Sequence, residues 1–67
     1  MRAGRVAEFD EERGLGVVVG DDGRAYPFHC TALADGSRTT RPGTRVRFAV
    51  RPGAPGVWEA AEVTAAG

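Results

Sequence analysis

Few side chains in this 67-residue chain could take part in chemistry. His29 and Cys30 are adjacent, Trp58 is the single tryptophan, and Arg13 follows an acidic run. A histidine could activate a neighbouring thiol, but adjacent strand residues point to opposite faces, so we expect no catalytic pair. One histidine and one cysteine are also too few for a structural zinc site. We therefore expect no enzyme, no metal site and no cofactor.

The charges balance overall but are unevenly distributed. The chain has nine basic residues, all of them arginine, and nine acidic residues. Residues 1–35 carry four arginines and seven acids, whereas residues 36–67 carry five arginines and two acids, giving about −3 and +3. Neutrality argues against strong sequence-independent binding to nucleic acid, which depends on neutralising phosphates. The asymmetry suggests either a basic and an acidic face or ordinary solvated surface.

Turn residues divide the chain into five runs of strand length. Gly, Pro and Asp recur at short intervals, and β-branched and aromatic residues fill the runs between them. We expect strands near residues 3–10, 15–20, 24–29, 44–51 and 57–65. A short helical turn near Thr31–Leu33, capped by Thr31, would interrupt the longer connection. This pattern predicts a single all-β domain over residues 1–67, folded as a small barrel or sandwich.

Alternation along these strands predicts which side chains face the core. Val18 shares one face of its strand with Gly16 and Gly20, and Tyr26 alternates with Pro27, which suits an exposed or edge position. Residues 15, 17, 27 and 29 would then project together from one outer wall of a closed cylinder of strands. The predicted core comprises Val6, Val18, Tyr26, Phe28, Leu33, Val46, Phe48, Ala61 and Val63. We expect Trp58 near the mouth of the barrel, on the face opposite Ala61 and Val63.

An ordered series of short motifs resembles the cold-shock domain nearly from end to end. Gly4-Arg5-Val6, Phe9-Asp10 and the segment 13–18 fall where that family has Gly-x-Val-Lys-Trp-Phe-Asn and Lys-Gly-Phe-Gly-Phe-Ile. The segment 26–33 is similar to Val-Phe-Val-His-Phe-Ser-Ala-Ile, and the segments 43–48 and 60–63 to Gly-x-x-Val-x-Phe and Ala-Ala-Asn-Val. The resemblance implies a five-stranded Greek-key barrel of the oligonucleotide-binding (OB) fold, with single-stranded DNA or RNA as the partner.

Most of the aromatic positions on which that family stacks bases carry other residues here. Glu8 stands at the tryptophan position, and the other replacements are Leu15, Val17, Pro27, Cys30 and Ser37. Stacking contributes about 1–3 kcal/mol per base, so losing four platforms at about 1 kcal/mol each weakens binding roughly a thousandfold. The resemblance thus implies a divergent member with weakened or altered binding.

The predicted nucleic-acid site combines the remaining stackers, cations and apolar side chains. Its stackers would be Phe9, His29 and Trp58, its phosphate ligands Arg13 and Arg38, and its apolar floor Leu15, Val17 and Pro27. Glu8 adds a negative charge beside the phosphate path, and exposed apolar patches usually mark interfaces. The alternative is therefore a protein–protein or self-association module, for example a homodimer, that has lost nucleic-acid binding.

The chain contains no apolar run long enough for a signal peptide or a membrane span. We therefore expect a cytoplasmic protein without a membrane partner. Arginine in place of all lysine, with abundant alanine and glycine, is typical of GC-rich bacteria.

Overall fold

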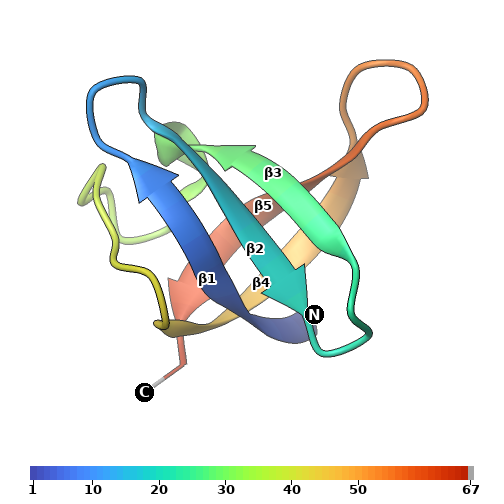
Figure 1. The fold of residues 1–67 in the computed structure, drawn as a ribbon, viewed down its shortest axis with the longest axis horizontal. Coiled ribbons are helices and arrows are strands. Elements are labelled where there is room, and N and C mark those ends of the chain that lie inside the picture. The colour runs from blue at the N-terminus through green and yellow to red at the C-terminus, as the bar shows by residue number, and fades with distance from the viewer. Residues whose placement is uncertain (67) are drawn as a thin grey trace.

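The structure, a computed structural model that describes residues 1–66, consists of one five-stranded antiparallel sheet. Its strands are β1 (Arg2–Asp10), β2 (Leu15–Gly20), β3 (Ala25–His29), β4 (Arg45–Pro52) and β5 (Trp58–Ala65). A short 3₁₀ helix, η1 (Cys30–Ala32), follows β3 (Figure 1). These bounds agree with the predicted strands to within one residue, and the all-β class is confirmed.

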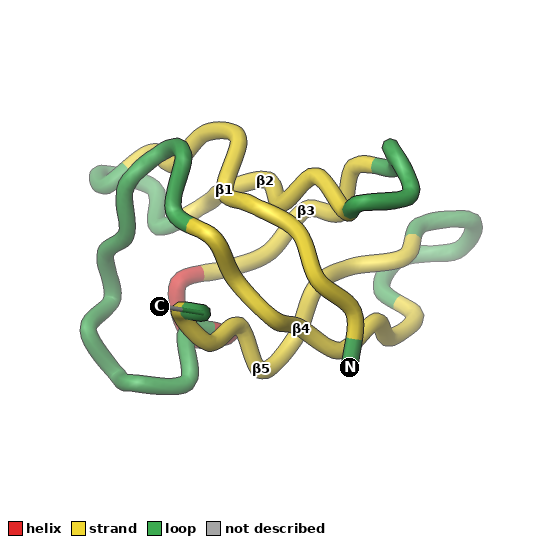
Figure 2. The backbone as a smooth tube through the Cα atoms, turned by 90° about the horizontal axis from the view of Figure 1, so that it is seen from below, coloured by secondary structure: helices red, strands yellow, loops and turns green. Residues whose placement is uncertain are grey.

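The sheet is rolled up around β1, which pairs with two neighbours. The strand order is β3-β2-β1-β4-β5; β1 pairs with β2 along most of its length but with β4 only through Arg2–Arg5. A register irregularity between Val6 and Glu8 bends β1, as β-bulges do. Figure 2 shows the β1–β2–β3 part of the sheet folded over the β4–β5 hairpin.

The expected closed cylinder is only partly formed. β3 and β5 end the sheet order, and no ladder joins them within residues 1–66. Backbone hydrogen bonding across the seam comes after β3, where Leu33 forms an isolated parallel bridge with Val63 and the Ala34 amide donates to the Val63 carbonyl at 2.8 Å. Local sequence cannot show that the sheet stays open between β3 and β5, because the residues that meet there lie about 30 positions apart in the chain.

The core lies between the two parts of the rolled sheet. All nine predicted core residues are buried, and Phe48 is fully buried with Val6 and Val18. Ala60 belongs to the core as well and was missed, because it directly precedes buried Ala61 and so breaks the alternation. The irregular β4–β5 register near Arg47 and Ala49 and the positive φ of Glu62 (50°) account for that break.

Candidate nucleic-acid interface

The outer side of β1, β2 and β3 carries an open hollow of about 600 Å³. Two cross-strand pairs form its centre: Leu15 lies opposite His29, and Val17 lies opposite Pro27. Leu15 is 48% exposed, while Val18 and Phe28 point into the core. The prediction that residues 15, 17, 27 and 29 share one outer wall is therefore confirmed. We call this concavity the outer hollow; its remaining lining residues are Glu8, Phe9, Asp10, Arg13, Gly16, Phe28 and Glu59.

Phe9 lines the outer hollow, but one face of its ring is already occupied. Phe9 and Phe28 stack with centroids 5.9 Å apart and an interplanar angle of 18°. Both rings lie over Gly16, where an added Cβ would be 2.6 Å from Phe28 Cζ and 2.9 Å from Phe9 Cδ1. Glycine at position 16 therefore makes room for the stacked pair, and half-buried Phe9 offers a ligand only its remaining surface.

The β1–β2 turn holds Arg13 at the rim of the outer hollow. The Asp10 carboxylate accepts hydrogen bonds from the backbone N–H groups of Glu12 and Arg13, at 3.0 and 3.2 Å. Gly14 has φ +65° and donates to the Asp10 carbonyl at 2.8 Å, which completes the turn. The Arg13 side chain is 78% exposed, and its Nε lies 3.9 Å from Asp10 Oδ2. Asp10 thus fixes the turn and offsets part of the charge of Arg13.

His29 is oriented by the chain that follows it. Its Nδ1 accepts the Thr31 backbone N–H at 3.2 Å and lies 3.0 Å from Thr31 Oγ1. A neutral His29 ring therefore carries its proton on Nε2. The residue that caps η1 is His29, so the prediction of Thr31 as the cap is wrong. An imidazole nitrogen can accept a backbone N–H in the first turn of a helix, as a capping hydroxyl does.

The contact between His29 and Cys30 also differs from expectation. Cys30 Sγ lies 3.8 Å from His29 Nδ1, although alternation along a strand would direct the two side chains apart. The strand ends at His29 and η1 begins at Cys30, so the alternation does not extend across this pair. Half-buried Cys30 packs against the core, and its sulfur lies 2.9 Å from where a Cβ on Gly14 would be.

Carboxylates surround the apolar floor of the outer hollow. Glu8 lies opposite Val17 in the β1–β2 ladder, and Asp10 lies opposite Leu15. Glu59 reaches the same hollow from β5, where its carboxylate accepts a hydrogen bond from Arg51 Nε at 2.9 Å. Within residues 1–66, Glu8 forms no ion pair. Sequence reasoning identified Glu8 but missed Glu59, which belongs to a strand about 50 residues away.

Two predicted site residues lie outside the outer hollow. Arg38 is in the loop between η1 and β4, with φ 61°, and the neighbouring Thr39 donates from Oγ1 to Glu11 Oε1 at 2.8 Å. This bond ties the loop to the β1–β2 turn that carries Arg13, although Arg38 itself does not line the outer hollow.

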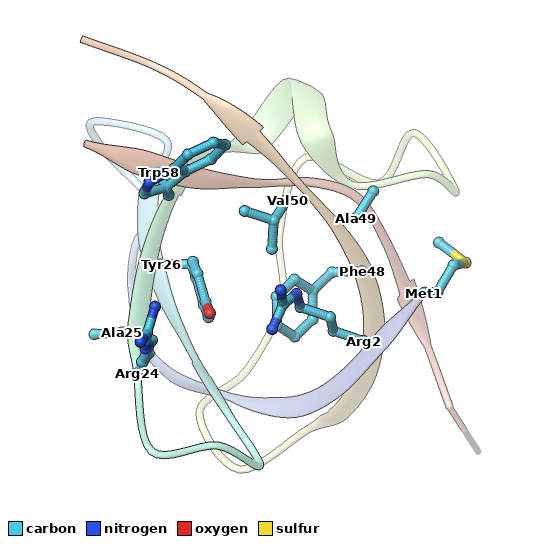
Figure 3. A pocket seen from close by; sticks show the side chains of 9 residues that line it. All are labelled: Met1, Arg2, Arg24, Ala25, Tyr26, Phe48, Ala49, Val50 and Trp58. Atoms are coloured by element: carbon cyan, nitrogen blue, oxygen red, sulfur yellow. The ribbon is translucent and has the colours of Figure 1, made fainter. Parts of the chain in front are cut away.

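Trp58 lines a different concavity, of about 1010 Å³, at the end of the rolled sheet (Figure 3). Trp58 shares its side of β5 with Ala60, which belongs to the same core cluster as Val63. We expected Trp58 on the face opposite Ala61 and Val63; the regular register of residues 58–61 keeps it opposite Ala61, whereas the irregularity beyond Ala61 puts Val63 on the side of Ala60 and Trp58. We call this concavity the mouth hollow.

A group of neighbouring arginines lies on another outer surface, across β1 and β4. Arg5 is directly opposite Arg45, and Arg47 is opposite Ala3. Arg45 forms a bidentate pair with Asp21 at 3.2 and 3.3 Å. Arg5 and Arg47 form no ion pair with residues 1–66. The sheet thus has an acidic outer surface over β1–β2 and a basic one over β1–β4.

Comparisons with models of known protein families and with curated proteins give no match for this chain. The cold-shock resemblance therefore remains a prediction based on the quoted motifs. In the part of the chain that the structure describes, no helix has the length and apolar character needed to cross a membrane. Residues 1–66 also contain no group of three or more side chains suited to holding a metal ion.

Proposed function

We propose that this chain is a divergent cold-shock-type protein that binds single-stranded nucleic acid weakly through the outer hollow. The observation that carries the proposal is the shared outer wall of Leu15, Val17, Pro27 and His29, open to solvent and next to Arg13. Bases would lie on the apolar floor and against the His29 ring. Arg13 would contact a phosphate from the rim.

The charges around the outer hollow support weak rather than strong binding. Arg13 is accompanied by three carboxylates, on Glu8, Asp10 and Glu59. Phosphates approaching this surface meet a net negative charge, and few counterions are released. We therefore expect micromolar or weaker dissociation constants at low salt and a shallow dependence of the binding constant on salt concentration.

A fluorescently labelled pyrimidine-rich oligonucleotide tests the proposal by anisotropy at low and moderate salt. Arg13→Gln should weaken binding and reduce the slope of log K against log salt by about 0.7, the contribution of one phosphate contact on a single strand. The matched control is Arg47→Gln on the basic surface, which should leave affinity unchanged. Absence of binding at low salt, or a larger loss with Arg47→Gln than with Arg13→Gln, contradicts the proposal.

A second candidate function is self-association through the same surface. The specific observation in its favour is the exposed apolar side chain of Leu15, which a second copy of the chain could cover. Light scattering distinguishes the two functions. The alternative would be established if the wild-type chain is a dimer that does not bind the oligonucleotide and the Leu15→Ser variant is a monomer.

A further inference from the structure

The mouth hollow combines an exposed indole with a buried aromatic floor. Trp58 is 56% exposed, whereas Tyr26 and Phe48 beneath it are buried. Tyr26 and Phe48 pack with ring centroids 5.3 Å apart and an interplanar angle of 53°. Figure 3 shows Trp58, Val50 and Tyr26 around the same open space. A planar apolar group could enter here and cover the indole, which otherwise remains in water.

The charge of the mouth hollow is opposite to that of the outer hollow. Arg2 and Arg24 line it, and no carboxylate side chain does among residues 1–66. The nearby Asp22 already accepts three hydrogen bonds: from the Arg24 backbone N–H at 2.9 Å, the Tyr26 hydroxyl at 3.0 Å and Arg2 Nη1 at 3.4 Å. The Arg24 guanidinium forms no ion pair within the described chain, so it remains available to an anion.

Size and composition together restrict the ligand. A hollow of about 1010 Å³ is at the upper end of the range for small-molecule sites, which are mostly apolar and contain a few polar groups. A purely apolar ligand would leave the Arg24 guanidinium at its edge without a partner, and a simple inorganic anion would leave the indole uncovered. A ligand that is both planar and anionic would cover the indole and also pair with the guanidinium.

We propose that the mouth hollow binds a planar aromatic group bearing a phosphate, such as a nucleoside monophosphate, with the ring on Trp58 and the phosphate at Arg24. The site is separate from the outer hollow and does not depend on the proposed function there. The same chemistry could come from a free nucleotide or from the phosphorylated end of a nucleic-acid strand.

Trp58 reports on this site directly, because it is the only tryptophan in the chain. Adding AMP to the full-length protein should change Trp58 emission saturably at millimolar concentrations or below. Adenosine, which lacks the charge, should bind about tenfold more weakly, since one charge-assisted contact is worth about that factor. Inorganic phosphate alone should leave the emission unchanged. No saturable change with AMP, or equal affinity for AMP and adenosine, would overturn the proposal.

Variants on the exposed surface separate the two halves of the site. Arg24→Gln should reduce the affinity for AMP to that for adenosine, whereas the matched control Arg41→Gln should not change it. Trp58→Ala, followed by calorimetry, should weaken AMP binding about 5–150-fold, the range for loss of one stacked base. Unchanged AMP binding in either Arg24→Gln or Trp58→Ala would contradict the assignment.

The two sources of the ligand are distinguished with a short oligonucleotide, with and without a 5′-phosphate. A Trp58 response to AMP but to neither oligonucleotide identifies a free nucleotide, and a response only when the 5′-phosphate is present identifies a strand end. Because Trp58 does not line the outer hollow, oligonucleotide binding there changes the anisotropy without changing Trp58 emission. Failure of one proposal is thus distinguishable from failure of the other.

Discussion

The two hollows of this small protein differ in the charges that line them and in the exposed indole that only the mouth hollow has. The outer hollow has an aliphatic floor of Leu15, Val17 and Pro27 and a rim rich in carboxylates. The mouth hollow has an aromatic lining, including exposed Trp58, with arginines at its edge. The comparison shows that a strand pattern can locate an exposed wall without determining the chemistry of that wall. Charges at the edge of the wall, from β1 as well as from the distant β5, decide what the wall attracts.

The largest effect is expected from adding one aromatic platform to the outer hollow. Glu8→Trp removes a carboxylate opposite Val17 and adds a surface for stacking, so oligonucleotide affinity should rise by about 1–3 kcal/mol, or about 5–150-fold. Anisotropy with a labelled oligonucleotide measures the gain. Glu12→Trp in the exposed β1–β2 turn is the matched control and should give little gain. Equal gains from both variants would mean that the outer hollow is not the binding surface.

A second substitution tests the packing beneath the outer hollow. Gly16→Ala forces the Phe9–Phe28 pair apart and should destabilise the fold by about 1–3 kcal/mol, a large part of the roughly 3–10 kcal/mol available to a chain this short. Urea unfolding measures the loss. In Gly53→Ala the added Cβ meets only the flexible end of Glu59, at 2.7 Å, so this control should cost much less. A Gly16→Ala protein as stable as wild type would show that the stacked pair is not fixed by that glycine.

The smallest expected effect concerns the carboxylate beside the mouth hollow. The Arg24 backbone N–H is the main cause of a lowered pKa for Asp22; desolvation opposes it, and the Tyr26 hydroxyl and the Arg2 and Arg24 charges lower the pKa further. A lowered pKa means that the stabilisation is present above 3.8, the ordinary value, and is lost as the pH falls through the lower folded value. Asp22→Asn should therefore have a lower melting temperature than the wild type at neutral pH. In acid, the melting temperatures of the two proteins should converge.

Asp35 provides the control for this pH dependence. Its pKa is also lowered, chiefly by the backbone N–H of Ser37, but it does not line the mouth hollow. Asp35→Asn should therefore change the acid dependence of stability without changing AMP binding. Asp22→Asn should alter both, since Asp22 holds Arg2 and Tyr26 in place. Identical AMP affinities in the two variants would show that Asp22 does not organise the mouth hollow.

The strands and the core could be predicted because their signals are local. Alternation around Val18 and Phe28, with glycine at the turns, determines which side chains point inward, and the structure agrees. The pairing of Leu15 with His29 follows from the same alternation together with a short β2–β3 connection.

The parts that could not be predicted depend on long-range or irregular geometry. Nothing near Glu59 in sequence indicates that it will reach a hollow formed by β1, β2 and β3. The irregularity in β5 reverses the expected relation of Trp58 to Val63, and no turn residue marks it. His29 could be predicted as the cap of η1 only if the end of β3 at that residue were already known.

Amide chemical-shift mapping with a pyrimidine-rich oligonucleotide at low salt tests the central claim most directly. The account predicts that the perturbed amide resonances cluster at residues 8–17 and 28–29, around the outer hollow, while the amide resonances of Trp58 and Arg24 do not shift. Perturbations confined to Arg5 and Arg47 on the basic surface, or none at millimolar oligonucleotide, would contradict it.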